Sequence, residues 1–207
     1  MFINVIGQSI KKFESSIVEY KRDKILNEYY LSVLRKLGKI DVALEYWKDL
    51  QGTVGDTNNY TVFNPTFEKR DEFAPFNWSV IDKRKYFSEI DQDGGLYASY
   101  GDSTARVLTE QILRLESGRD YKLDVNAEWS YKRRQGFFTW QVVCFESSDI
   151  ISEINMDETS KENSGGIINF TVPGECDFQI LRLVAKPGQY SQRIWSRTKF
   201  VTITMLQ

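Results

Sequence analysis

Residues 121–146 read YKLDVNAEWSYKRRQGFFTWQVVCFE, and apolar and polar side chains alternate along both halves of this stretch. Such alternation places the apolar residues on one face of a β strand and the polar residues on the other. Each apolar set contains a tryptophan, Trp129 in the first half and Trp140 in the second, and we expect both to lie in a core. Between the halves, KRRQG (residues 132–136) has the composition of a solvated turn. The stretch therefore predicts two strands joined by a hairpin turn.

The same pattern extends on both sides of this stretch, from about residue 60 to the C-terminus. Turn clusters such as DQDGG, GDS, ESGRD, PGE and KPGQ separate short apolar segments. The polar, acidic segment Ser147–Ser164 is expected to be a long loop. About ten strands without intervening helices favour a mainly β fold, a jelly-roll β-sandwich. The predicted strands are Thr61–Glu68, Trp78–Ile81, Tyr86–Ile90, Leu96–Tyr100, Arg106–Leu115, Tyr121–Tyr131, Phe137–Glu146, Gly166–Val172, Phe178–Ala185 and Lys199–Met205.

The first 50 residues follow a different period. From Gln8 to Leu50 the chain has one glycine, Gly38, and no proline, and its apolar residues recur at helical spacing. We expect two or three short helices that form a helical hairpin, with Gly38 ending one of them. The polar segment QGTVGDTNN has the composition of a linker. The predicted organisation is a short α-helical hairpin segment at 1–50, a linker at 51–59 and the sandwich at 60–207.

Composition excludes several kinds of site. The formal net charge of −2 gives no overall field to attract a polyanion, which disfavours nucleic acid as a partner. The absence of histidine excludes a Ser-His-Asp triad and a histidine-bearing zinc site. The two cysteines, Cys144 and Cys176, either form one disulfide in an oxidising compartment or remain buried thiols. No segment approaches the ~20 apolar residues of a membrane span, and the chain as given shows no signal peptide.

Several motifs in the sandwich region resemble one known family. NPTFE (64–68), FNWSV (76–80) and the run from GLYASY to NAEWS (95–130) are similar to the opening of jelly-roll carbohydrate-binding modules, which have a galactose-binding-like β-sandwich. Within that run, Gln111 and Gly118 hold the places of the glutamine and glycine in the family pattern, and Tyr121 holds that of its tyrosine. The resemblance implies a non-catalytic module that binds a glycan or polysaccharide.

Two further motifs extend the resemblance. INFTVPGECDFQILRL (168–183) resembles a bacterial variant of the module that follows tetratricopeptide-type helices. YYLSVLRKLGKIDVALEYWKDL (29–50) resembles the end of such a helical array. Many of these modules hold a structural calcium through the opening Glu and an acidic pair in the last strand. Here Glu68 is present, but KFVTITMLQ (199–207) has no acidic residue, so we expect no calcium site, no other metal and no cofactor.

A sugar site needs planar hydrogen-bonding side chains beside an aromatic ring that stacks on a pyranose. If their strands adjoin, one polar sheet face supplies these groups, and Tyr131 or Phe137 supplies the ring. The alternative is the plain polar outer face common in antiparallel sheets. The candidate ligand-binding residues are Gln111, Asn126, Glu128, Tyr131, Gln141 and Arg182. A second candidate is the loop KPGQYSQRIWSRTK (186–199), through Tyr190, Arg193 and Trp195.

No acidic pair stands out in an apolar setting, so we expect no catalysis. The sequence therefore predicts a carbohydrate-binding module of a bacterial envelope or exported protein, periplasmic or extracellular, without nucleic acid as a partner. The alternative is a protein–protein scaffold in which the sandwich caps a tetratricopeptide-type array and the N-terminal helices bind partners. An exposed polar-aromatic sheet face favours the first function. An exposed apolar stripe of Tyr29, Tyr30, Val33 and Trp47 on the helices favours the second.

Overall fold

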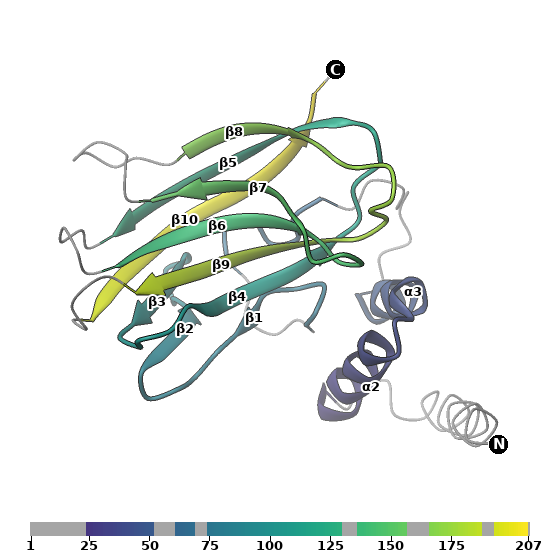
Figure 1. Ribbon diagram of the computed structural model, residues 1–207. Helices are drawn as coiled ribbons and strands as arrows, with labels where there is room; N and C mark the ends of the chain where they lie inside the picture. The colour runs from purple at the N-terminus through teal and green to yellow at the C-terminus, as the bar shows by residue number, and fades with distance from the viewer. Residues whose placement is uncertain are drawn as a thin grey trace. The chain divides into compact units, whose positions relative to one another are not determined.

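The computed structural model describes residues 24–51, 61–68, 74–129, 136–156, 166–187 and 193–206 (Figure 1). The chain divides into two compact units, Met1–Val54 and Gly55–Gln207. The helical spacing predicted between residues 8 and 20, and most of the predicted linker, lie outside the described residues, so those boundaries stay a prediction.

The first unit contains a helical hairpin of α2 (Lys24–Lys36) and α3 (Ile40–Gln51). Gly38 separates them with a φ of 68°, a left-handed conformation that glycine adopts without steric cost, and the predicted break there is confirmed. The Lys39 N–H donates to the Leu34 carbonyl at 2.9 Å and closes the end of α2. Among the described residues, no helix combines the length and hydropathy needed to cross a bilayer. The buried apolar face of the hairpin consists of Tyr30, Leu31, Leu34, Ile40, Ala43, Leu44 and Trp47.

The second unit is a sandwich of two antiparallel five-stranded sheets, which confirms the predicted mainly β fold. In the first sheet the strand order is β1-β4-β9-β6-β7, and in the second it is β2-β3-β10-β5-β8. The first sheet contains β1 (Ser79–Val80), β4 (Arg106–Leu113), β9 (Gln179–Pro187), β6 (Gly136–Cys144) and β7 (Ile150–Asn155). The second contains β2 (Tyr86–Ile90), β3 (Leu96–Tyr100), β10 (Ile194–Met205), β5 (Asp120–Trp129) and β8 (Gly166–Thr171).

The core lies between the two sheets and is filled by the apolar residues of the alternating pattern. On β5, Tyr121, Leu123, Val125 and Ala127 are buried, as the sequence predicted. Trp140 on β6 is 0% exposed, and its ring packs edge-to-face on Trp78 with centroids 5.7 Å apart. Trp78 in turn contacts Phe67 at 5.0 Å. This aromatic layer gives the sandwich its largest apolar contribution per side chain.

The predicted hairpin between β5 and β6 is wrong. β5 pairs with β10 and β8 in the second sheet, whereas β6 pairs with β7 and β9 in the first. Residues 130–135, which connect the two strands, lie outside the described residues. Alternation shows which face of a strand is apolar but does not show which strand it pairs with. The two apolar faces therefore meet across the core, and the two polar faces point to opposite sides of the sandwich.

Three further strand predictions differ from the structure by more than a residue or two. The edge strand β7 lies within the segment Ser147–Ser164 that was expected to be a loop. Its outward-facing residues are polar, as is usual on the solvent side of an antiparallel sheet, and this polarity gave the segment the composition of a loop. β10 begins at Ile194, five residues before the predicted start at Lys199. Thr61–Glu68 is not a strand but an irregular segment, in which Asn64 and Phe67 have positive φ angles.

Gln111 holds that irregular segment in place. It lies opposite Leu181 of β9, so its side chain points to the core and is 0% exposed. Its Nε2 donates to the Phe63 carbonyl at 2.9 Å, and its Oε1 accepts the Phe63 N–H at 2.8 Å. The amide thus replaces a strand as the hydrogen-bonding partner of Phe63. We conclude that Gln111 has a structural role.

The structure joins Cys144, at the end of β6, to Cys176 in the connection between β8 and β9. Their Cα atoms are 5.6 Å apart, a usual separation for a disulfide, and both residues are buried. The bond closes a loop with a sequence separation of 32 residues and therefore restricts the unfolded chain.

We predict that Gln111→Met lowers the free energy of unfolding by about 2 kcal/mol, because both hydrogen bonds to the Phe63 backbone are lost at similar side-chain volume. Urea denaturation measures this value. Gln92→Met in the exposed turn after β2 is the matched control and should change stability by less than about 0.5 kcal/mol. Equal stability of the two variants would contradict the structural role of Gln111.

For the cysteines, we predict that the unreduced protein resists alkylation under denaturing conditions and that the reduced protein takes up two alkyl groups, as mass spectrometry can show. Reduction should lower the free energy of unfolding by about 2–4 kcal/mol. Two alkyl groups on the unreduced protein would show free thiols instead.

Candidate ligand-binding faces

The structure does not bring the predicted site residues together on one face. Asn126 and Glu128 lie on the outer face of the second sheet, on β5. Gln141 on β6 and Arg182 on β9 lie on the outer face of the first sheet. Gln111 points to the core, as described above. Of the other members of the two candidate sets, Tyr131 and Tyr190 lie outside the described residues, whereas Arg193 and Trp195 lie within them.

On the first sheet, polar side chains bond to one another across three strands. Arg182 lies opposite Gln141, which lies opposite Glu153 of β7. The Arg182 Nε donates to Gln141 Oε1 at 3.0 Å, and Gln141 Nε2 donates to Glu153 Oε2 at 2.9 Å. Gln141 is only 3% exposed. The hydrogen-bonding groups of Gln141 are therefore engaged inside the protein, which is typical of a plain structural face.

Phe137, the alternative stacking ring, also lies on this outer face. The Lys186 ammonium lies over its ring, 5.3 Å from the centroid. A cation–π contact of this kind covers one face of the ring. One face of the Phe137 ring is therefore already engaged by a cation of the protein.

On the second sheet, three aromatic side chains form a continuous group on the outer face, which we call the ring trio: Phe87 of β2, Tyr97 of β3 and Trp195 of β10. The rings of Tyr97 and Trp195 are stacked, with centroids 6.4 Å apart and planes 20° apart. Phe87 contacts Tyr97 at 5.8 Å. Trp195 is 39% exposed. The trio therefore presents a partly exposed aromatic plane on a rigid sheet.

Charged side chains lie beside the ring trio. In register across three strands, Arg197 of β10 lies between Tyr97 and Glu128. Arg197 Nε contacts Asp91 Oδ2 at 2.9 Å, and Lys199 Nζ contacts Glu128 Oε1 at 2.6 Å. The hydrogen bond from Lys199 lowers the pKa of Glu128 below its usual value, so this carboxylate is ionised at neutral pH.

Asn126 completes the polar surroundings. It lies opposite Phe200 and one outward position along β5 from Glu128, about 7 Å away at the strand repeat. The face thus combines an aromatic plane with ionised and amide groups, and Asn126 and Glu128 of the sequence prediction belong to it.

Trp195 was expected in a loop, and this placement is wrong because β10 includes it. The inner positions of this part of β10 are Ile194, Ser196 and Thr198, all buried. Serine and threonine in inner positions conceal the apolar alternation on which strand prediction rests. Sequence reasoning did not single out Phe87 and Tyr97 either. The alternation of the predicted strands could have identified both residues, because each occupies an outward position next to an inward tyrosine or leucine.

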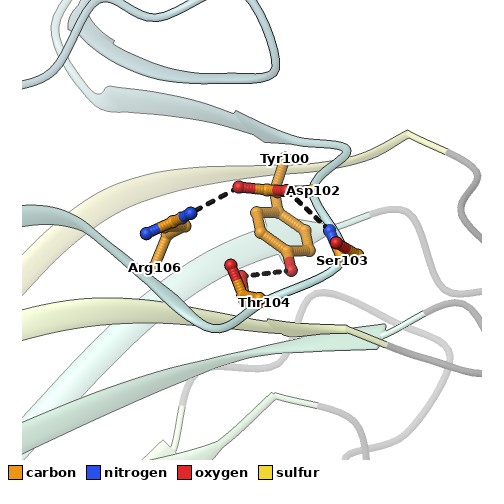
Figure 2. Close-up of polar contacts among 5 residues, drawn as sticks. All are labelled: Tyr100, Asp102, Ser103, Thr104 and Arg106. Carbon is orange, nitrogen blue, oxygen red and sulfur yellow. Dashed lines mark hydrogen bonds and ion pairs between the residues drawn. The ribbon is translucent and has the colours of Figure 1, made fainter.

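The turn after β3 is held by the cluster in Figure 2. Asp102 accepts hydrogen bonds from Arg106 Nε at 2.8 Å and from the Ser103 N–H at 2.7 Å. The buried Tyr100 hydroxyl donates to the Thr104 carbonyl at 2.8 Å (Figure 2). Burial, with a smaller contribution from Asp102, raises the pKa of Tyr100 to about 12. All of these bonds are local to the turn, so we assign the cluster a structural role.

Metal ligands were not expected from the sequence. Potential ligand atoms of Cys144, Glu146 and Cys176 lie within 4.8 Å of one another. Because the two sulfur atoms are bonded to each other, they are not thiolates and do not supply the ligands that a metal needs. The disulfide therefore accounts for this group.

No family model matches the sequence, and no curated protein matches it. Among solved structures, a cyclase from Fischerella sp. TAU is similar with a TM-score of 0.51 and 12% identity over 72% of this chain and 96% of that chain. TmCBM61, solved in complex with β-1,4-galactotriose, has a TM-score of 0.46 and 15% identity over 72% and 99% of the two chains. A CBM4 structure has a TM-score of 0.45 and 15% identity over 62% and 94%. The likeness to the cyclase shows a shared fold.

We predict that Arg106→Gln raises the pKa of Asp102 towards 3.8, because the hydrogen bond and charge of Arg106 hold it down. A carboxyl pKa lowered by folding stabilises the protein above pH 3.8, and this contribution is lost as the pH falls through the lowered value. NMR titration of the carboxyl carbon measures it. Lys199→Gln is the control, which should raise the pKa of Glu128 and leave Asp102 unchanged. An unaltered Asp102 pKa in Arg106→Gln would contradict the assignment.

Proposed function

We propose that the sandwich is a carbohydrate-binding module whose site is the outer face of the second sheet. The observation that carries this proposal is the stacked, partly exposed Tyr97–Trp195 pair. The apolar face of a pyranose packs on an aromatic plane, and its hydroxyl groups need donors and acceptors at the rim. Arg197, Glu128 and Asn126 are positioned to supply them. The resemblance of residues 64–130 to carbohydrate-binding modules supports the same function.

In this proposal the protein binds a glycan or polysaccharide without chemical conversion. A polysaccharide-binding role suits a rigid sheet, because the rings and the ion-paired side chains need little reordering when a ligand arrives. The Cys144–Cys176 disulfide supports an oxidising location, periplasmic or extracellular, as part of an exported bacterial protein.

A second candidate is the protein–protein scaffold. Ile25 and Tyr29, one helical turn apart on α2, are 77% and 60% exposed, and such an apolar pair suits a partner surface. Two members of the predicted stripe, Tyr30 and Trp47, are buried instead, at 5% and 1% exposure. The tetratricopeptide-like identity of the helices remains part of this second proposal.

Affinity gel electrophoresis over a panel of polysaccharides tests the carbohydrate-binding proposal. We predict that Trp195→Ala weakens retardation by the bound polysaccharide about tenfold or more, which corresponds to about 1.4 kcal/mol. Ile167→Ala is the matched control, because Ile167 is also an exposed apolar side chain on the second sheet, in β8. It should bind as the unchanged protein does.

In the same experiment, Arg182→Ala tests the outer face of the first sheet, whereas Trp195→Ala tests the outer face of the second. Loss of retardation in Arg182→Ala, with none in Trp195→Ala, would move the site to the first sheet. Absence of retardation by every polysaccharide tested would overturn the proposal.

A further inference from the structure

Four cationic residues gather at the edge of the ring trio. Lys83 and Tyr86 exchange backbone hydrogen bonds at 3.1 and 3.2 Å, so Arg84 and Lys85 form the tip of a tight turn just before Phe87. Arg193 reaches this turn, since its Nη2 donates to the Arg84 carbonyl at 2.9 Å. We call Lys83, Arg84, Lys85 and Arg193 the basic tip, and all four residues are exposed.

Backbone contacts fix the basic tip beside the ring trio. The Gly101 N–H donates to the Lys85 carbonyl at 2.8 Å and continues the pairing of β2 with β3. A Cβ atom on Gly101 would lie 3.7 Å from the Arg193 Cβ. Arg193 precedes Trp195 by two residues in the same extended run, so both project from the same face of the sheet, about 7 Å apart. A ligand that stacks on Trp195 therefore comes within reach of Arg193.

Few carboxylates offset these charges. Asp102 already binds Arg106 and the Ser103 N–H (Figure 2). Asp91 binds Arg197 at the other end of the face. Among the described residues, Asp82 adjoins the basic tip in sequence and Asp102 interacts electrostatically with Lys85. Two negative charges therefore stand against the four positive charges of the tip and that of Arg106. In a chain of net charge −2, this is a local concentration of positive charge.

We propose that the ligand of this face is an acidic polysaccharide. A sugar ring stacks on Trp195, and the carboxylate or sulfate group of that sugar or its neighbour binds the basic tip. Arginine and lysine form charge-assisted hydrogen bonds with such anions, and arginine does so with two parallel bonds. This inference rests on the proposed carbohydrate-binding function and names the substrate class of the same site.

The test uses affinity gels that contain polygalacturonate, alginate, hyaluronate or chondroitin sulfate, each beside its carboxyl-reduced or desulfated derivative. We expect retardation by at least one acidic polymer and about tenfold less by its neutral derivative. Retardation should weaken as salt rises, because charge pairs on a surface are screened. Comparison of the carboxylated polymers with the sulfated one shows which of the two anionic groups the protein binds.

Arg84→Gln/Lys85→Gln/Arg193→Gln removes three charges of the basic tip and should weaken binding of the acidic polymer about tenfold or more. Arg119→Gln/Arg182→Gln/Lys186→Gln removes the same number of charges from the turn before β5 and from the outer face of the first sheet, and should retain binding. Arg84→Lys/Lys85→Arg/Arg193→Lys keeps the charges and should retain most of it. Thermal melting of each variant shows that it is folded.

Three results would overturn the inference. If neutral and acidic polymers bind equally, and Trp195→Ala but not the charge-removing variant loses binding, the site takes neutral glycans and the proposed function stands. If no polymer in either series is retarded, both proposals fail. If an oligo-thymidine competes fully for binding at moderate salt, the basic tip serves a nucleic acid instead.

Discussion

Burial of the aromatic layer between the two sheets is the constraint on which the rest of the structure depends. Trp140 is fully enclosed and packs on Trp78, which packs on Phe67, so rings from three separate parts of the chain share one core. Each strand must turn its apolar side to this layer. The polar side of each strand then lies on the outer face of either the first or the second sheet. This division decides which residues can form a site together.

Two buried glutamine side chains form hydrogen bonds with irregular backbone segments that cover this core. Gln111 pairs with both polar groups of Phe63, and Gln179 accepts the Leu115 N–H at 2.8 Å while it donates to the Cys176 carbonyl at 2.8 Å. Both side chains are 0% exposed. An amide has a donor and an acceptor at one end, so it can stand in for a neighbouring strand where none is present. The chain thereby covers the core without leaving buried backbone groups unpaired at these points.

The two outer faces differ in how their side chains are engaged. On the first sheet Arg182, Gln141 and Glu153 satisfy one another, and Lys186 covers Phe137. On the second sheet the ring trio keeps part of its surface in solvent, and its charged neighbours form ion pairs at its border. A ligand gains most where aromatic surface is still hydrated, because its binding removes that surface from water. This difference favours the second sheet, and it separates a structural polar face from one suited to recognition.

The sequence by itself determined the class of fold and, along β5 and β6, which side chains point inward and which point outward. Alternation over residues 121–146 predicted correctly that Trp140 is buried and that Asn126, Glu128 and Gln141 point outward, because side-chain direction follows from the two-residue strand repeat. It also predicted the helix break at Gly38 from the backbone freedom of glycine. The inner Ser196 and Thr198 hid the first half of β10, and with it the strand position of Trp195. Only the tertiary structure decided the strand partners. Pairing joins segments far apart in the sequence, and no local pattern records whether consecutive strands share a sheet or face each other across the core. For this reason the tertiary structure alone placed Gln141 and Glu128 on opposite sides and assembled Phe87, Tyr97 and Trp195 from three strands into one aromatic surface.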